Sequence, residues 1–303
     1  PPRAGPRAGG KRAQPPAAAA AEGTVIVGGG IAGLAAAAAL RNIAGVRNVR
    51  VLEKFDERSF ANDRTGAGAQ LGPNGLRALR AIGGDELLQK VLASGTILRG
   101  NAVRLPTPPG PMIISDTTAE DDHAGLPQVL MRWGALRSLL ADLLPEGCVE
   151  CGVGEDVAGY RPSGNKEEEE GVTLIDWEGN DIVVGSGSSS SSSSSSSSAA
   201  VAVAPLVVAA DGIYSTFRPL VDSSGSGGGR TALSRVDERR EGIKYNRRIN
   251  IKAAVESELG ADEGFEQGHT YSFFAPDGSV ACFAGPAGGG GTYWGVFLLG
   301  KIL

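Results

Sequence analysis

The sequence has few of the residues that build metal centres, disulfide frameworks and membrane spans. It contains three cysteines and two histidines, which argues against a zinc site with two ligand pairs and against a disulfide-rich secreted domain. No apolar run reaches the roughly 18 residues that a membrane helix needs, and the longest, 199–210, is interrupted by Pro205. We therefore expect an intracellular protein with no metal site and no transmembrane segment.

A strong charge of either sign is also missing. The net charge is −5 and no basic patch occurs, so nucleic acid is not an expected partner. The proportions of hydrophobic residues (41%) and charged residues (21%) are those of a soluble globular protein. A chain of this length holds one large domain or two smaller ones.

The start of the chain differs from the rest. Residues 1–21 contain four basic residues, no acidic residue, and mainly proline, glycine and alanine. Such a segment has little to pack, so we predict a disordered leader over 1–22. A basic, acid-free leader is also one signature of a transit peptide, which would direct the protein to a plastid or mitochondrion.

The stretch 24–53 has the pattern of a dinucleotide-binding unit. The runs 24–27 and 49–52 predict two strands, and the alanine-rich run between them, ending near Ala44, predicts a helix. Residues 28–33 between the first strand and the helix fit G-x-G-x-x-G. This context favours an adenine dinucleotide site over a plain glycine-rich turn. The stretch by itself leaves open which dinucleotide binds.

Each residue of the glycine motif has a predicted physical role. Gly28 permits a tight turn out of the strand, Gly30 lets a pyrophosphate approach the backbone, and Gly33 lets the helix pack closely. Ile31 and Ala32 begin the helix. Their free N–H groups, together with the helix dipole, are expected to face the phosphates.

Two acidic residues are predicted at the carboxyl ends of strands, where open α/β sheets bind ligands. Glu53, followed by Lys54, stands twenty positions after Gly33, which suits a hydrogen bond to ribose hydroxyls. Asp211-Gly212 follows a predicted buried strand at 199–209. Since Asp-Gly is also common in ordinary turns, the local sequence leaves both interpretations of Asp211 open.

The segment after Glu53 is predicted to be a loop followed by helices. Residues 66–74 are small and predicted to be flexible, which suits the approach of a flat ring system. Asn74 is the expected N-cap of a helix over 75–82, with Gly83-Gly84 as its stop signal. A second short helix is expected to begin at Asp85.

Arg132 is predicted to lie at the junction between a strand and a helix. The helix, 133–144, has leucines at helical spacing. Two interpretations of Arg132 stay open. In the structural one it pairs with an acidic residue at the surface, and in the functional one it holds a phosphate or an isoalloxazine edge. Strands are also expected at 96–116 and beyond 239, with a glycine-rich hairpin loop at 285–291.

Three separated motifs together resemble one family. Residues 25–33, Arg132 before the leucine-rich helix, and 209–218 (AADGIYSTFR) occur in this order in the group A FAD-dependent monooxygenases, the aromatic-ring hydroxylases and zeaxanthin-epoxidase-like enzymes. Residues 66–74 are also similar to the family's corresponding segment. The resemblance covers about 23–300.

The resemblance implies an α/β fold, with an FAD-binding Rossmann-like (GR2-type) domain and an inserted mixed β-sheet substrate domain. The FAD-binding domain would comprise 23–95 and 128–222, and the substrate domain 96–127 and 239–303. We interpret the serine tract 188–198 as an insertion in a hairpin. The alternative is a linker between two domains.

The resemblance also implies roles for particular residues. The three motif glycines would hold the FAD pyrophosphate and Glu53 the adenosine ribose. Ala67 and Gly68 would lie near the flavin, Arg132 would contact FAD, and Asp211 would serve both the pyrophosphate region and NAD(P)H. The predicted cofactor-binding residues are Gly28, Gly30, Ile31, Ala32, Gly33, Glu53, Lys54, Ala67, Gly68, Arg132, Asp211 and Gly212.

The implied activity is that of a monooxygenase. NAD(P)H would reduce FAD, and O₂ would give a flavin C4a-hydroperoxide that transfers one oxygen atom to an aromatic or isoprenoid substrate. We assign no catalytic acid or base. The alternatives are another FAD-dependent dehydrogenase or oxidase, or a non-catalytic binding protein of the GDP-dissociation-inhibitor type. The Asp-Gly motif argues against the former, and the intact glycines with Glu53 argue against the latter.

One motif of the family does not occur in the sequence. The family has a further Gly-Asp motif, followed by Ala-Ala-His and a proline, that binds the FAD ribityl chain. It is not found before Leu303. We therefore expect a C-terminally truncated chain that holds mainly the adenosine and pyrophosphate half of the cofactor.

Overall fold

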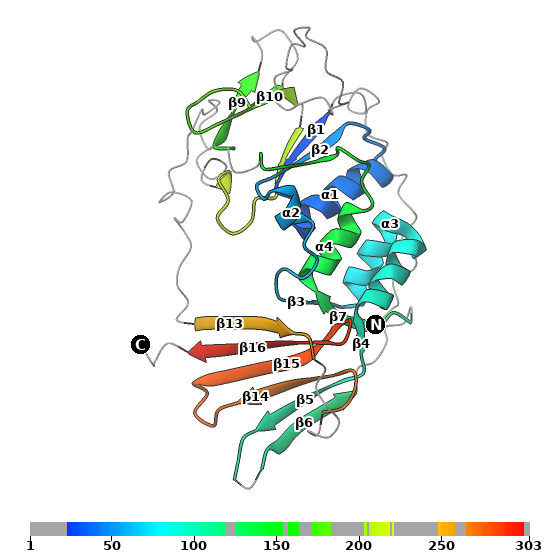
Figure 1. Ribbon diagram of the computed structural model, residues 1–303, viewed down its shortest axis with the longest axis vertical. Coiled ribbons are helices and arrows are strands. Elements are labelled where there is room, and N and C mark those ends of the chain that lie inside the picture. Colours follow the sequence, from blue (N-terminus) through cyan, green and yellow to red (C-terminus); the bar gives the residue numbers. More distant parts are fainter. Residues whose placement is uncertain are drawn as a thin grey trace, which may run out of the picture.

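The computed structural model describes residues 23–108, 110–118, 125–153, 157–163, 171–182, 203–204, 206–218, 220, 248–257 and 265–299. The predicted leader (1–22) and the serine tract (188–198) lie outside these ranges, as does His123, one of the two histidines and predicted to be a solvated loop residue. The described elements form an upper part with helices and a lower part of strands (Figure 1).

The helices in the described ranges are α1 (Ile31–Asn42), α2 (Glu57–Phe60), α3 (Pro73–Ser94) and α4 (Trp133–Ala141). The strands up to α4 are β1 (Thr24–Val27), β2 (Val49–Glu53), β3 (Gly68–Leu71), β4 (Thr96–Leu98), β5 (Gly100–Leu105), β6 (Met112–Thr118) and β7 (Gln128–Arg132). The strands after α4 are β8 (Val149–Cys151), β9 (Gly159–Ser163), β10 (Gly171–Ile175), β11 (Val203–Ala204), β12 (Leu206–Ala209), β13 (Arg248–Val255), β14 (His269–Phe274), β15 (Val280–Gly288) and β16 (Gly291–Leu299).

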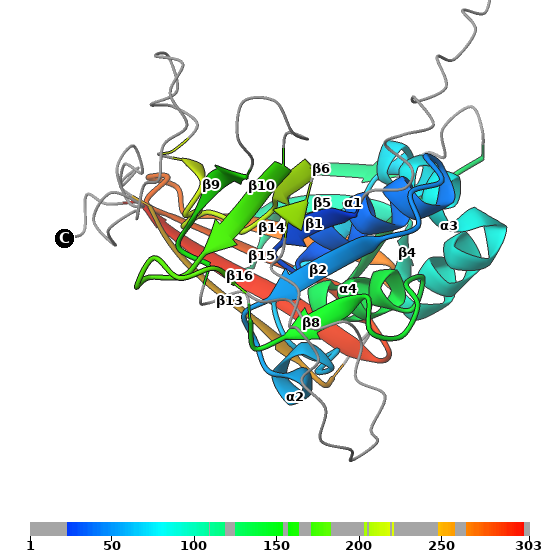
Figure 2. The same cartoon turned by 90° about the horizontal axis from the view of Figure 1, so that it is seen from above.

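A four-stranded parallel sheet of order β12-β1-β2-β8 organises the upper part. β1 is buried along its whole length, and its alternate side chains enter two different cores, as the two-residue period of a strand requires. Ile26 packs with Ala37 of α1 and with Val51. Val25 packs on the opposite face with Leu174 of β10. The sheet is therefore covered by α1 on one face and by the β9–β10–β11 sheet on the other (Figure 2).

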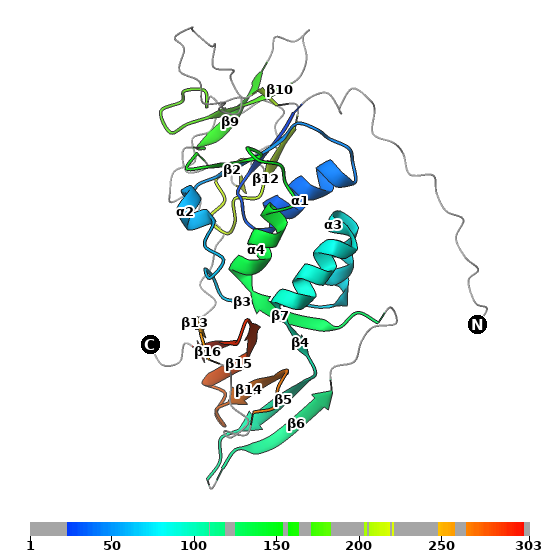
Figure 3. The ribbon, with the colours of Figure 1, turned by 45° about the vertical axis from the view of Figure 1, so that its right-hand side comes forward.

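A six-stranded mixed sheet of order β13-β16-β15-β14-β5-β6 forms the lower part. Its β14–β5 pair is parallel, and the other pairs are antiparallel. The small sheet β3-β7-β4 lies between the two parts (Figure 3). Leu98 and Leu130 from this small sheet pack with Ala287 and Tyr293, which joins the small sheet to β15 and β16. The predicted α/β class with an additional mixed β-sheet is confirmed, and the exact domain boundaries stay a prediction.

The segment between β2 and α3 is more ordered than predicted. Residues 68–71 form β3, which pairs antiparallel with β7, so the prediction of a flexible segment is wrong there. The preceding loop contains the short helix α2, whose N-terminus is capped by Asp56 accepting from Ser59 N. Pairing with β7, distant in sequence, supplies backbone hydrogen bonds that the glycine-rich composition does not reveal.

The start of α3 also differs from the prediction. Its N-cap is Gly72 and its first residue is Pro73, so Asn74 is not the N-cap. Proline suits the first helical position, because its fixed φ is helical and its missing N–H is not needed there. The predicted break is present at Gly84, whose φ of 70° and ψ of −170° are not helical. The second helix predicted from Asp85 is confirmed, and it continues to Ser94.

Two strand predictions need correction. The predicted hairpin loop at 285–291 is mostly strand, because β15 extends to Gly288 and β16 begins at Gly291. The strand at 199–209 was predicted to be buried, yet β12 is an edge of the described parallel sheet and its Leu206 is 48% exposed. An edge strand has a neighbour on one side only, and a run of apolar residues does not reveal this.

Within the described ranges, no helix combines the length and the apolar character needed to cross a membrane. No cluster of three or more His, Cys, Asp or Glu side chains suited to a metal ion is present among these same residues.

Candidate functional site

The parallel sheet creates a cavity at the carboxyl ends of its strands, and we call it the glycine-loop cavity. Because β1, β2 and β12 run in the same direction, the loops that follow them meet at one edge. The cavity has a volume of about 180 Å³. Its lining comprises Val27, Gly28, Gly29, Gly30, Leu52, Glu53, Lys54, Phe55, Trp133, Arg137, Ala210, Asp211 and Gly212. The structure thus brings six of the predicted residues together in this lining, namely Gly28, Gly30, Glu53, Lys54, Asp211 and Gly212.

Two of the three motif glycines are required by packing. Gly28 has a φ of +109°, and a Cβ there would lie 2.3 Å from the carbonyl oxygen of Ala210. A Cβ on Gly33 would lie 1.9 Å from the carbonyl oxygen of Gly28. By contrast, a Cβ on Gly30 would meet no atom within 4 Å. Gly30 is therefore the position at which the backbone is open to a ligand.

The N-terminus of α1 opens at the same loop. Its N-cap is Gly30, which makes no side-chain capping hydrogen bond, and its first turn contains no acidic residue. Ile31 and Ala32 begin this turn. A helix start without a capping side chain offers backbone N–H groups and the positive end of its dipole to an anion.

Glu53 holds the glycine loop in place. The residue is 5% exposed, and its Oε2 accepts a hydrogen bond of 2.6 Å from Gly29 N. Its Oε1 accepts one of 2.9 Å from Phe55 N. Each carboxylate oxygen has a second lone pair, so these bonds leave capacity for ribose hydroxyls.

The Glu53→Gln variant is expected to destabilise the ligand-free protein by about 1–3 kcal/mol, because one buried backbone N–H would then face an amide NH₂ group. Urea unfolding followed by circular dichroism measures this change. Glu57→Gln, in the exposed helix α2 of the same segment, is the matched control. Equal unfolding midpoints for Glu53→Gln and the wild type would show that Glu53 does not hold the loop.

Asp211 forms the turn that its sequence context allows and also lines the cavity. Its Oδ2 accepts a hydrogen bond of 2.6 Å from Thr216 N, and Gly212 has a φ of +86°. Ala210 N donates to Val27 O at 2.8 Å, which fixes this turn beside the glycine loop. The turn interpretation and the cavity position are thus compatible in one geometry.

Six of the twelve predicted residues do not line the glycine-loop cavity. Ile31, Ala32 and Gly33 lie in the first turn of α1, and Ala67, Gly68 and Arg132 lie elsewhere. Arg132 lines a second cavity of about 290 Å³, which we call the Arg132 cavity. The carbonyl oxygen of Ala67 accepts from Trp133 N at 2.9 Å, and Gly68 lies against the ring of Tyr293. The lining of the Arg132 cavity is Asp63, Arg64, Ser94, Arg132, Ala135, Glu256, Ala287, Gly288 and Gly289.

Sequence reasoning missed three side chains of the glycine-loop cavity, Phe55, Trp133 and Arg137. The aromatic residues carry no motif. Arg137 lies within the leucine-rich helix, four positions after Trp133, and is 3% exposed. That i, i+4 spacing of an aromatic ring and an arginine is a signal that could have identified the pair.

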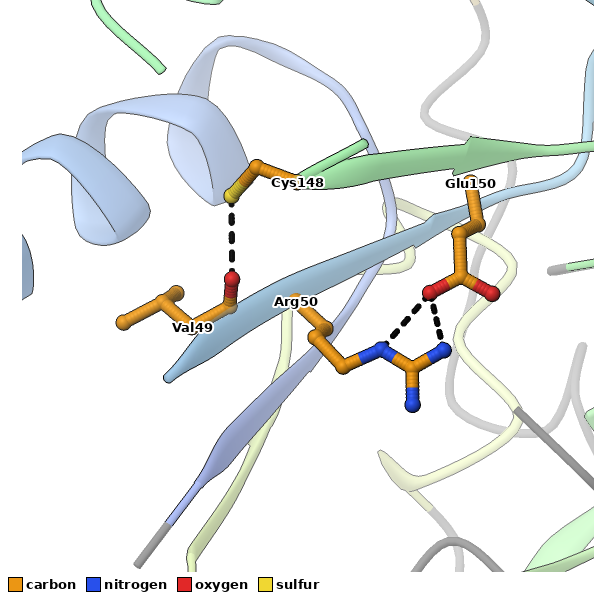
Figure 4. Close-up of polar contacts among 4 residues, drawn as sticks. All are labelled: Val49, Arg50, Cys148 and Glu150. Atoms are coloured by element: carbon orange, nitrogen blue, oxygen red, sulfur yellow. Dashed lines mark hydrogen bonds and ion pairs between the residues drawn. The ribbon is translucent and has the colours of Figure 1, made fainter. Parts of the chain in front are cut away.

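Two of the three cysteines, Cys148 and Cys151, form a C-x-x-C pattern in the backbone that pairs with β2 of the parallel sheet. Cys148 Sγ donates to Val49 O at 3.0 Å, next to an ion pair between Arg50 and Glu150 (Figure 4). Burial raises the pKa of Cys148. Burial, with nearby Glu53, raises the pKa of Cys151 to about 11. Thiols of high pKa are poor nucleophiles and metal ligands at neutral pH.

Alkylation of Cys151 by iodoacetamide at pH 8 is expected to be about 100-fold slower in the folded protein than in urea, because its thiolate fraction falls with the raised pKa. The folded-state pKa exceeds the unfolded one, so any stabilisation by the neutral thiol is lost as pH rises from about 9 to about 11. Peptide-resolved mass spectrometry measures the rate. Equal rates in the folded and unfolded chain would contradict the burial of this thiol.

Comparisons with known proteins address the fold. The sequence over residues 26–79 matches the family described as NAD(P)-binding Rossmann-like domain. No curated protein matches the sequence. Among solved structures, Klebsiella pneumoniae HpxO complexed with FAD and uric acid is 20% identical to this chain, with a TM-score of 0.59. The matched region covers 91% of this chain and 56% of the HpxO chain.

Two other solved structures give the same result. CtdE in complex with FAD is 16% identical and covers 92% of this chain and 59% of its own, with a TM-score of 0.57. The tetrameric form of 2-methyl-3-hydroxypyridine-5-carboxylic acid oxygenase is 19% identical, with the same coverages and TM-score. The chain thus spans less than two thirds of each structure. At these identities the similarity establishes the fold: the chain has a Rossmann-like α/β fold shared with structures that hold FAD.

Proposed function

We propose that this chain is part of an FAD- and NAD(P)H-dependent monooxygenase. The observation that carries the proposal is the convergence, on one cavity, of an open glycine loop, an uncapped helix start and two acidic side chains, Glu53 and Asp211. The chain folds like two proteins solved with FAD and one named an oxygenase. The order of its motifs supports the same assignment.

The ADP half of the cofactor would occupy the glycine-loop cavity. Its phosphates would lie against Gly30 and the N-terminus of α1, and its ribose beside Glu53. A volume of about 180 Å³ is smaller than the roughly 300–1,000 Å³ of a typical small-molecule site. The cavity therefore suits part of a dinucleotide, and the remainder must extend beyond it.

The flavin half would extend towards the Arg132 cavity. Both cavities border the junction of β7 and α4: Trp133 and Arg137 line the first, and Arg132 and Ala135 line the second. The lining of the Arg132 cavity includes residues of the upper part and of the six-stranded sheet. Two of its lining residues, Arg64 and Glu256, form an ion pair at 2.8 Å. In this arrangement Arg132 and the Ala67–Gly68 backbone would contact the flavin half.

When bound, FAD would supply the redox chemistry. The chain would bind and orient it: Glu53 and Gly30 would fix the adenosine and phosphate groups, and Arg132 the flavin side. We propose a small aromatic or isoprenoid substrate with O₂ as co-substrate, and the face of the six-stranded sheet next to the Arg132 cavity as its site.

Flavin absorbance and substrate-dependent turnover test this function. The full-length protein purified with FAD is expected to absorb near 375 and 450 nm (roughly, for an oxidised flavin) and to oxidise NAD(P)H faster with aromatic or isoprenoid compounds. Absence of bound flavin would overturn the proposal. Flavin binding with NAD(P)H oxidation that no such compound stimulates would favour another FAD-dependent oxidoreductase, a dehydrogenase or an oxidase.

A further inference from the structure

Arg137 is a buried cation at the wall of the glycine-loop cavity. Its side chain is 3% exposed. Its guanidinium lies over two aromatic rings, 4.8 Å from the ring centroid of Phe60 and 5.1 Å from that of Trp133. A side chain held by packing in this way loses little entropy when it binds a ligand. The arginine is thus held in one position beside the cavity.

The hydrogen bonds of Arg137 use only part of its guanidinium. Nη2 donates to the carbonyl oxygens of Ser59 at 3.4 Å, Asn62 at 3.2 Å and Phe60. Nε is buried and has no hydrogen-bond partner among the described residues. The three bonds hold the end of α2 and the loop that follows it, and they leave N–H groups of the same guanidinium for another acceptor.

No carboxylate of the described residues forms an ion pair with Arg137. Burial lowers the pKa of Arg137, and the charge of Glu53 opposes this change only in part. A buried cation without a close anion is costly, because the desolvation of its charge is not repaid. An anion bound in the cavity would repay it.

The cavity already has a second feature that favours anions, the uncapped start of α1 at Gly30. The planar fork of a guanidinium matches phosphate oxygens. We propose that Arg137 is a further cofactor-binding residue, whose free N–H groups donate to a phosphate of the dinucleotide in the glycine-loop cavity. The identity of the dinucleotide in this proposal rests on the proposed function. The contact between Arg137 and a phosphate rests only on the geometry of the cavity.

Binding of ADP and of adenosine to the Arg137→Gln and Arg137→Lys variants tests this role. By calorimetry, Arg137→Gln is expected to weaken ADP binding about 10- to 100-fold and to leave adenosine binding within about twofold. Arg137→Lys, which keeps the charge but loses the fork, is expected to fall between. Arg80→Gln, at an exposed ion pair in α3, is the control and is expected to match the wild type.

A purely structural role predicts a different pattern. ADP and adenosine would then weaken equally in both Arg137 variants, or neither would change, and either result would overturn the proposal. If Arg137→Gln does not fold, the test uses NMR spectra of the arginine Nε–H groups in the ¹⁵N-labelled wild type instead of this variant. The signal that is missing in Arg137→Lys is expected to shift with ADP and not with adenosine, and its failure to shift with ADP would also overturn the proposal.

FAD titration of the same proteins separates the two proposals. If the wild type binds ADP but not FAD, and Arg137→Gln weakens ADP binding, the flavoprotein function fails and the phosphate role of Arg137 stands. If FAD and ADP bind equally well to Arg137→Gln and the wild type, the role of Arg137 fails and the proposed function stands.

Discussion

The Gly33→Ala variant is expected to lose its stable fold. The added methyl group would lie 1.9 Å from the carbonyl oxygen of Gly28, a backbone atom that has no rotamer to escape into. Relief requires α1 to move away from β1, which opens the core around Ile26 and Ala37. Overpacking of this severity costs about 3 kcal/mol or more, a large part of a typical domain's stability.

Urea unfolding followed by far-UV circular dichroism measures this loss. Gly75→Ala is the matched control, because the added Cβ there would have only ordinary contacts with Leu71, at 3.6 Å and beyond, and alanine favours a helix over glycine. This control is expected to be as stable as the wild type or slightly more stable. An unfolding midpoint for Gly33→Ala equal to that of the wild type would contradict the close approach of α1 to the loop.

The Gly30→Ala variant is expected to lose dinucleotide binding while keeping its stability. Gly30 has a φ of −75°, which alanine adopts freely, and its Cβ would meet no protein atom within 4 Å. Alanine is a poorer N-cap than glycine, but the change costs only about 1 kcal/mol, well below the cost expected for Gly33→Ala. The methyl group would instead occupy the space through which a pyrophosphate approaches the backbone.

We expect ADP affinity to fall about tenfold or more, which is at least 1.4 kcal/mol, and to fall further in Gly30→Val. Calorimetric titration, with urea unfolding of the same samples, separates binding from folding. Unchanged ADP affinity in both variants would show that no phosphate lies against Gly30. A large loss of stability would instead show that Gly30 is a packing residue like Gly33.

Features with local causes could be predicted from the sequence. The strand, loop and helix of 24–42 follow from neighbouring residues, since periodicity selects the element and the glycines permit the turn. Glu53 was found because the length of a βαβ unit sets where its second strand ends. These rules need no knowledge of the rest of the chain, and the structure places each of these elements as predicted.

Features that depend on distant segments could not be predicted. Residues 68–71 are a strand because β7 pairs with them, and their own composition suggests only flexibility. Arg137 is buried because Phe60, Trp133 and carbonyl oxygens at the end of α2 surround it. Arg132, only five positions earlier, lines the other cavity. The i, i+4 spacing pairs Arg137 with Trp133, but which arginine meets which cavity depends on how α4 packs.

The sequence by itself thus determined that a glycine loop and an acidic residue would meet at the end of a parallel sheet, because these are consequences of backbone geometry within one βαβ unit. The same local rules predicted a separate role for each of the three glycines, and only the tertiary structure decided which backbone atoms each of them meets. Gly28 and Gly33 are in contact with backbone that the fold brings close, Ala210 and the loop itself. Gly30 alone of the three remains open, because no atom of the described residues lies within 4 Å of a Cβ placed there.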